Sequence, residues 1–178
     1  MKLYIMRHGE TTTNIKHLIC GKSETDLTMN GILQARNAGE KLKGIKFDEV
    51  IVSPLSRARI TAGNVVSQAM IVDKRLIERD YGDFEFKRKA DVDYDGFWNY
   101  NLNYNGCNGE SIKDLFKRMD LFMKDLLDRY SDKTVLLVTH SGIARALHYY
   151  ITGIPEDGDL TKLEIPNCCF RVYDIRGN

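Results

Sequence analysis

The most constraining feature of this chain is a continuous apolar run of strand length, from Thr134 to Val138. A strand with one solvent-exposed face alternates apolar and polar residues, whereas a strand of a parallel sheet is covered on both faces and stays apolar throughout. Two further runs, at 3–6 and 50–52, are also short, apolar and rich in β-forming residues. Together, the three runs predict a largely parallel sheet that lies between two layers of helices.

Segments with helical periodicity separate these runs. Thr28 can cap a helix whose apolar residues recur at three- and four-residue steps over 32–42. In the next predicted helix we expect Ile60 to lie on the inward side. Ser111 begins a sequence that resembles a capping box, and the apolar residues of 112–127 then repeat at helical spacing. These segments supply the helices that such a sheet requires.

The elements follow the order β-α-β-α-β, an irregular insert, and then α-β-α-β, with the last strand expected at 169–175. This order predicts a three-layer α/β/α sandwich with a largely parallel central sheet. With 178 residues and 43% hydrophobic content, the chain suits a single domain, 1–178. The insert, at about 87–110, has scattered aromatic residues and no clean period, although it could contain a short helix around Trp98. Because long irregular inserts are commonly lids or binding loops, we expect this one to face the substrate, with plain packing as the alternative.

Charge and cysteine content narrow the class of partner. The 26 basic and 25 acidic side chains nearly cancel, so no global field favours nucleic acid or an anionic membrane surface. The N-terminal apolar stretch ends at Arg7, which makes it too short for a signal peptide, and no later run has the length of a membrane span. The four cysteines include no CxxC pair, and we interpret them as reduced thiols of a cytoplasmic protein.

Charged or titratable residues follow three of the predicted strands. Arg7 and His8 come after the first strand, Arg57 follows the second, and His140 comes after the long buried run. The carboxyl ends of parallel strands meet at one edge of the sheet, where open α/β proteins bind their ligands. Guanidinium groups match phosphate oxygens and stabilise a transferring phosphoryl group. The pattern therefore predicts a small cationic pocket for a small-molecule phosphoester.

The same pocket needs a nucleophile and a proton donor. No Gly-x-Ser-x-Gly motif or cysteine-centred loop is present, whereas histidine is a recognised covalent catalyst, and His8 is the better placed of the two. His140 would then donate to the phosphoryl oxygens, and Glu78 could protonate the leaving oxygen. Asp80 and Glu85 are weaker candidates for this proton transfer. A metal site on the two histidines is disfavoured, because the neighbouring arginines would repel a cation.

A series of short motifs runs the length of the chain. They are 7–11 (Arg-His-Gly-Glu-Thr) with Asn14, Gly21, 27–31, 53–62, 78–85, 109–111 and 139–142 (Thr-His-Ser-Gly). In this order the motifs resemble those of the histidine phosphatase superfamily, also called the phosphoglycerate mutase-like family. The resemblance implies a phosphohistidine intermediate on His8, with no metal and no cofactor. It also implies phosphate contacts from Arg7, Arg57 and His140, proton transfer by Glu78, and secondary substrate contacts from Asn14, Gly21 and the Ser141 backbone.

One departure from the family bears on substrate choice. Where many relatives read Gly-x-Trp-Glu-Gly, this chain has Gly82-Asp83-Phe84-Glu85-Phe86, which puts the pocket wall and the role of Glu85 in question. The chain is more similar to the phosphatase branch, including α-ribazole phosphatase-like members, than to the mutases. We therefore expect a phosphomonoesterase. A phosphoglycerate mutase-type transferase is the nearest alternative, and a non-catalytic phospho-ligand binding module is a weaker one; the oligomeric state stays open.

Overall fold

A five-stranded sheet forms the centre of the computed structural model, which describes residues 1–104 and 106–175. Residue 105 of the expected insert and the last three residues of the expected domain lie outside the described residues. The strands are β1 (Lys2–Arg7), β2 (Glu49–Val52), β3 (Ile71–Val72), β4 (Thr134–Thr139) and β5 (Phe170–Asp174). The helices are α1 (Thr12–Ile15), α2 (Met29–Leu42), α3 (Ser56–Val65), α4 (Tyr94–Phe97), α5 (Ile112–Tyr130) and α6 (Ser141–Thr152), with 3₁₀ turns η1 (Lys74–Leu76), η2 (Gly82–Phe84) and η3 (Lys89–Asp91).

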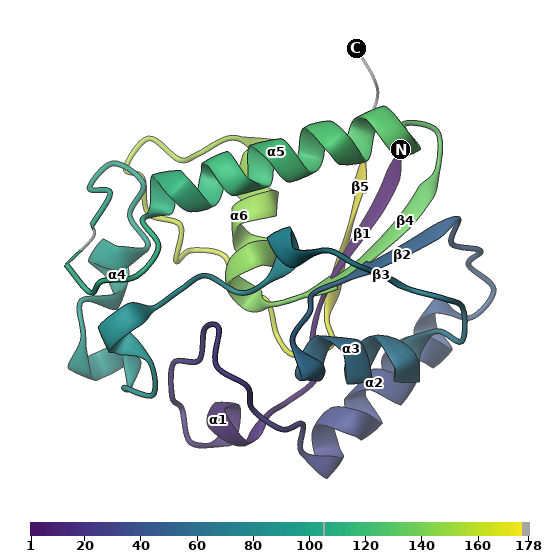
Figure 1. Ribbon diagram of the computed structural model, residues 1–178, viewed down its shortest axis with the longest axis horizontal. Helices are drawn as coiled ribbons and strands as arrows, with labels where there is room; N and C mark the ends of the chain where they lie inside the picture. The colour runs from purple at the N-terminus through teal and green to yellow at the C-terminus, as the bar shows by residue number, and fades with distance from the viewer. Residues whose placement is uncertain (105, 176–178) are drawn as a thin grey trace.

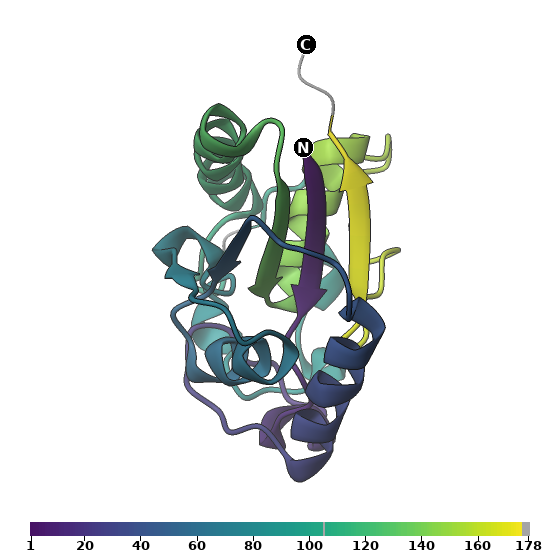
Figure 2. The same cartoon turned by 90° about the vertical axis from the view of Figure 1, so that its right-hand side faces the viewer.

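The sheet has the order β3-β2-β4-β1-β5. Strands β1, β2, β3 and β4 are mutually parallel, and β5 pairs with β1 in the antiparallel direction. Figure 2 shows β5, in yellow, beside the purple β1 at this edge of the sheet. The long apolar run thus lies in the middle of the sheet, with β1 and β2 on either side of it. The predicted fold class is confirmed.

Alternating side chains of the strands pack against opposite helical layers, as the geometry of a pleated strand requires. Along β1, Leu3 and Ile5 belong to the core formed with α5 and α6. Their neighbours Tyr4 and Met6 belong to the core formed with α2 and α3. Figure 1 shows α5 and α6 on one side of the sheet and α2 and α3 on the other. The sheet is apolar on both faces because each face has its own helical layer.

Helix α3 differs from the expectation in the side that it buries. Ile60 is 46% exposed, whereas Ala58, Thr61 and Ala62 face the core. Alanine and threonine allow α3 to approach the sheet and α2 closely, and a larger side chain at the contact would hold the helix away. The prediction that Ile60 points inward was therefore wrong, because it weighted hydrophobicity above size.

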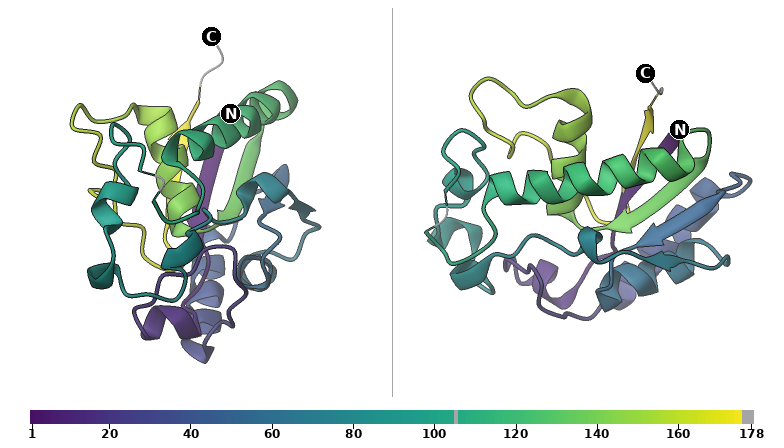
Figure 3. Two further views of the ribbon diagram at one scale, coloured as in Figure 1. Left: turned by 60° about the vertical axis from the view of Figure 1, so that its left-hand side comes forward. Right: turned by 45° about the horizontal axis from the view of Figure 1, so that its top comes forward.

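The insert combines core packing with a cavity wall. Phe97 and Trp98 are fully buried at and just after α4, which confirms a short helix next to Trp98. Figure 3 shows α4 beside the first turn of α5, beyond the ends of the strands. Residues 89–90 and 92–95 line the main cavity of the described chain, and Val92 and Tyr94 among them also pack against the core. In the part of the chain that the structure describes, no helix is both long and apolar enough to cross a bilayer.

Candidate active site

The carboxyl ends of β1 and β4 place two histidines side by side. Arg7 and Thr139 are partners in the parallel register, and the His8 N–H donates to the Thr139 carbonyl at 2.9 Å. As a result, the imidazole rings of His8 and His140 lie with their centroids 5.1 Å apart. Parallel pairing of two adjacent strands is thus sufficient to bring together residues from opposite ends of the chain.

His8 presents one ring nitrogen to the cavity. Its Nδ1 lies 2.7 Å from the Gly9 carbonyl oxygen, which can only accept, so Nδ1 carries the proton and Nε2 keeps its lone pair. The side chain is buried yet lines the cavity. Burial, reinforced by the charges of Arg7 and Arg57, lowers the pKa of His8 well below its ordinary value. A neutral imidazole with a free Nε2 is the form that can attack phosphorus.

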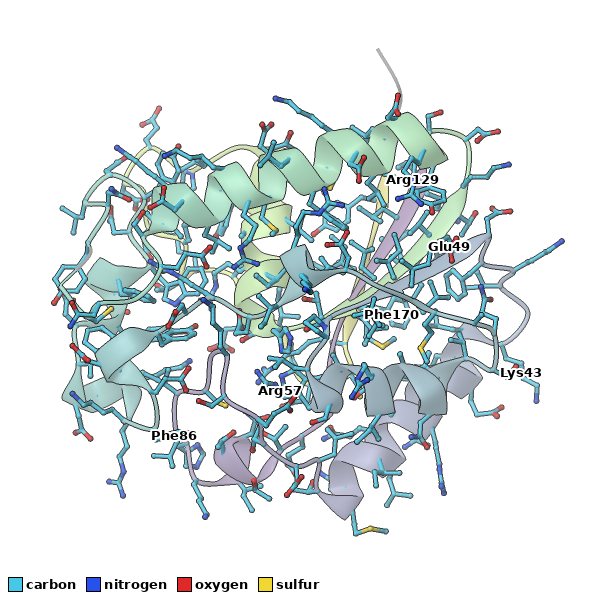
Figure 4. All side chains as sticks on the ribbon, viewed as in Figure 1. Lys43, Glu49, Arg57, Phe86, Arg129 and Phe170 are labelled. Carbon is cyan, nitrogen blue, oxygen red and sulfur yellow. The ribbon has the colours of Figure 1, made fainter. Side chains whose placement is uncertain are left out.

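Arg57 connects the second histidine to the loop that precedes α2. Its Nε donates to His140 Nδ1 at 3.3 Å, while Nη1 and Nη2 donate to the carbonyls of Ser23 and Gly21 at 2.7 and 2.6 Å. Figure 4 shows Arg57 at the first turn of α3, close to the ends of the strands. The guanidinium is 1% exposed and reaches the cavity wall. Gly21 therefore lies behind Arg57 and supports it through a carbonyl.

His140 is more enclosed than expected. Because Arg57 donates to Nδ1, Nε2 carries the proton and donates to Ser53 Oγ at 2.7 Å. Burial, then Arg57 and His8, lower the pKa of His140 well below its ordinary value. The ring is fully buried and does not line the cavity. Its contact with a phosphoryl oxygen stays a prediction, and the geometry instead shows Ser53 and Arg57 fixing its tautomer.

Glu78 lines the same cavity as His8 and Arg57. Its Oε1 accepts from the Arg79 N–H at 2.8 Å, and its Oε2 accepts from the Gly142 N–H at 3.0 Å. A Cβ at position 142 would overlap Oε1, so only glycine permits this approach. Each carboxyl oxygen is thereby oriented by a backbone amide, and the group is 3% exposed. The two weaker candidates for proton transfer have other partners. Asp80 forms an ion pair with Lys22, and Glu85 accepts a hydrogen bond from the Gly21 N–H in the loop that precedes α2.

The cationic residues of the cavity have no carboxylate attached to them. Arg7 donates from Nη1 to the Ile165 carbonyl at 2.7 Å, and its Nε has no hydrogen-bond partner. Burial lowers the pKa of Arg7, and Glu78 opposes that shift. Within residues 1–104 and 106–175, none of the ion pairs includes Arg7, Arg57 or Arg145. The positive charge of the pocket is therefore available to an anionic ligand.

The predicted secondary residues divide into two groups. Asn14 lines the cavity, and its Oδ1 accepts from the Thr11 N–H and from Asn167 Nδ2 at 3.1 Å each. Ser141 lines it at the first position of α6, where helix amide groups favour an anion. Gly21 is structural, since its N–H donates to Glu85 Oε1 at 2.8 Å. This contact explains Glu85, which fixes the loop that Arg57 also holds.

The cavity has a volume of about 750 Å³ and continues well beyond these groups. Its lining also includes Tyr81, Tyr94 and Arg145, none of which was predicted from the sequence as a site residue. The only available signal for Arg145 was its spacing: it follows Ser141 by four positions, so both lie on one face of α6. The two tyrosines gave no signal, because aromatic residues are scattered throughout that region.

The fold and the cavity together define an α/β protein with a largely parallel sheet and an arginine-lined cavity that contains a histidine at the strand ends. The chain belongs to the histidine phosphatase superfamily (branch 1), whose family model matches residues 3–178.

Relatives in this superfamily are similar over almost the whole chain. The adenosylcobalamin/alpha-ribazole phosphatase of Escherichia coli (strain K12) is 31% identical over 98% of this chain and 90% of its own length. A 2,3-bisphosphoglycerate-dependent phosphoglycerate mutase of Methylobacterium sp. (strain 4-46) is 34% identical over 99% and 92%. The crystal structure of the alpha-ribazole phosphatase from Shigella flexneri has a TM-score of 0.83 and 29% identity, and covers 99% of this chain and 91% of that one. Both phosphatases and mutases are therefore among the chain's relatives.

Proposed function

We propose that this protein is a phosphomonoesterase that hydrolyses a small phosphorylated metabolite through a phosphohistidine intermediate on His8. The observation that carries the proposal is the His8 imidazole, whose Nδ1 is held by the Gly9 carbonyl at 2.7 Å while Nε2 is free within a cavity lined by Arg7 and Arg57. Family membership supports the reaction class, and the geometry supports the assignment of the residues.

The first step transfers the phosphoryl group to the enzyme. His8 Nε2 attacks phosphorus in line, and the bond between phosphorus and the alcohol oxygen breaks. Glu78, in its carboxylic acid form, gives its proton to the departing oxygen, so the alcohol leaves neutral. The guanidinium groups of Arg7 and Arg57 stabilise the charge on the phosphoryl oxygens.

The second step regenerates the enzyme. Water attacks the phosphorus of the phosphohistidine, and the Glu78 carboxylate accepts a proton from that water. The bond between phosphorus and Nε2 breaks, and its electron pair returns to the imidazole of His8. Inorganic phosphate leaves, and Glu78 is again protonated for the next cycle.

His140, Asn14, Gly21 and Ser141 have supporting roles in this proposal. Ser141 and Asn14 line the cavity and can donate to phosphoryl oxygens, whereas Gly21 acts through Arg57. We expect the N–H at His140 Nε2 to donate to a phosphoryl oxygen of the bound ligand. This hydrogen bond would replace the one that Nε2 now makes to Ser53 Oγ.

A mutase is the second candidate function, because one relative of 34% identity is a phosphoglycerate mutase. The two reactions share the first step and differ in whether water or a second hydroxyl takes the phosphoryl group. Incubation with 3-phosphoglycerate separates them. Release of phosphate supports the phosphatase, and formation of 2-phosphoglycerate without phosphate release supports the mutase.

We place the protein in the cytoplasm as one domain, 1–178, that acts on a small-molecule phosphoester and binds no nucleic acid. The cysteines Cys20, Cys107, Cys168 and Cys169 are all free thiols, which supports a reducing compartment. Part of the insert, residues 89–90 and 92–95, lines the cavity, which supports a role in substrate recognition.

The direct test of the mechanism is trapping of the intermediate. Rapid acid-free quenching of wild-type protein with a phosphoester panel should give an acid-labile phosphoryl adduct that is absent from His8→Ala. His17→Ala is the matched control, since His17 does not line the cavity, and it should retain the adduct. Absence of an adduct and of phosphate release across the panel would favour the non-catalytic binding module.

A further inference from the structure

Arg145 is a cavity residue that the proposed reaction does not use. It lies one helical turn after Ser141 on the same face of α6, and both side chains line the cavity. Residues separated by four positions on a helix lie about 6 Å apart. A ligand whose phosphoryl group is at the start of α6 would therefore bring its leaving group to Arg145.

The contacts of Arg145 hold it in place without neutralising it. Its Nε and Nη2 donate to the Leu163 carbonyl at 3.2 and 3.1 Å, and its Nη1 donates to the Tyr94 hydroxyl at 3.3 Å. The guanidinium also lies 4.6 Å from the centroid of the Trp98 ring. These contacts use three of the donors of a guanidinium, which leaves one N–H on each of Nη1 and Nη2.

A buried cation that forms no ion pair is stabilised further when an anion binds beside it. Arg145 is only 5% exposed, and it forms none of the ion pairs among residues 1–104 and 106–175. In the proposed reaction the phosphoryl group already has Arg7 and Arg57, which line the cavity beside His8. Arg145 thus provides positive charge that the phosphoryl group does not require. It lies at a different point of the cavity wall from Arg7 and Arg57.

The charges around Arg145 and Tyr94 are mainly positive. Burial disfavours ionisation of the Tyr94 phenol, yet Arg145 and then Lys89 lower the pKa of Tyr94 below its ordinary value. Lys89 Nζ lies 4.6 Å from the centroid of the Tyr94 ring. Four carboxyl groups line the cavity. Glu78 is buried, but in the proposed first step it is in its carboxylic acid form and carries no charge. The other three are exposed, so water and salt screen them far more than the buried guanidinium. They are Asp93, Asp95 and Glu164.

We propose, on the basis of the proposed phosphatase function, that Arg145 and Tyr94 form a second subsite that binds an anionic group on the leaving alcohol. The substrate class is then a phosphomonoester whose alcohol carries a carboxylate or a second phosphate about one helical turn from the reacting phosphorus. Arg145 is a specificity-determining residue in this proposal, since it contacts the substrate and not the reacting atoms.

Matched substrate pairs test the subsite. 3-Phosphoglycerate and glycerol phosphate differ at the far end by a carboxylate against a hydroxymethyl group, and fructose 1,6-bisphosphate and fructose 6-phosphate differ by a second phosphate. The wild-type protein is expected to have a kcat/KM about tenfold higher for the anionic member of at least one pair, mainly through KM. The pair that shows the preference identifies the anionic group.

Three variants and one control connect that preference to Arg145. Arg145→Gln is expected to reduce the ratio within the preferred pair to about one. Arg145→Lys should keep part of the ratio, because the charge remains while the fork that contacts Leu163 and Tyr94 is lost. Tyr94→Phe preserves the packing and removes one hydrogen-bonding group, so it should lower the ratio by several-fold. Arg171→Gln, on the exposed side of β5, is the control and should leave the ratio unchanged.

The outcomes separate this inference from the proposed function. Equal kcat/KM values within both pairs, or an Arg145→Gln variant that loses activity equally on both members, would overturn the subsite while leaving the phosphatase intact. No phosphate release from any of the four esters or from p-nitrophenyl phosphate would overturn the phosphatase itself.

Discussion

The backbone N–H of Gly142 donates to Glu78 Oε2 at 3.0 Å, so the first turn of α6 positions the carboxyl group proposed as the general acid. A Cβ at position 142 would overlap Oε1 of the same carboxyl group and would lie 3.0 Å from its Cδ. The absence of a side chain at 142 therefore determines where Glu78 can lie.

Gly142→Ala should displace Glu78 and lower kcat for alkyl phosphates by about a hundredfold, because general acid catalysis depends on position. p-Nitrophenyl phosphate has a leaving group that needs little protonation, so its kcat should fall much less. Steady-state kinetics on the two substrates checks this. Gly63→Ala is the control, since a Cβ there meets nothing within 4 Å. An equal loss on both substrates would contradict the assignment.

Arg57→Gln should lower both activity and stability. The variant removes the cation from the cavity and the donors to Gly21 and Ser23, and it leaves those two carbonyls without their partner. We expect kcat/KM to fall by at least a hundredfold and the free energy of unfolding to fall by about 2–3 kcal/mol. Urea denaturation and kinetics measure the two effects. Arg59→Gln, on the exposed side of the same helix, should change neither.

The free energy of unfolding should decrease as the pH falls below about 6.5, the usual pKa of histidine in an unfolded chain. His8 and His140 both have pKa values well below that in the folded state, so the unfolded chain binds more protons in this range. Each histidine should contribute a loss of about 1.4 kcal/mol per pH unit until its folded pKa is reached. Urea denaturation between pH 7.5 and 5.5 measures the slope, and a flat profile would contradict the buried neutral state of both rings.

Phe86 has a backbone φ of +60°, which is the left-handed region that favours glycine. Glycine adopts this conformation without steric cost, so the phenylalanine side chain puts backbone strain at this position. Phe86→Gly should change the free energy of unfolding by less than about 1 kcal/mol, because relief of strain offsets the extra entropy of the unfolded chain. Phe86→Val should lower it by about 1–2 kcal/mol, since β-branched residues fit this region poorly. Thermal or urea unfolding measures both, and Lys87→Val is the neighbouring control.

Much of the site could be inferred from local patterns. An apolar run marks a strand buried on both faces, and Arg7, His8 and His140 each follow such a run. Parallel strands have their carboxyl ends at one edge, so residues at those ends must converge wherever the strands are neighbours. The α/β sandwich and the histidine pair at its edge follow from this argument.

Other features depend on contacts between segments that no local pattern relates. The antiparallel β5, the enclosed state of His140 between Arg57 and Ser53, and the loop-holding role of Glu85 belong to this group.

The sequence by itself determined the order of strands and helices and the residue types at the strand ends, because hydrophobic periodicity is a local property of the chain. Only the tertiary structure decided which nitrogen of each histidine carries the proton, which glycine makes room for Glu78, and that Arg145 and Tyr94 face the same cavity. Those properties depend on distances of a few ångströms between side chains that packing brings together.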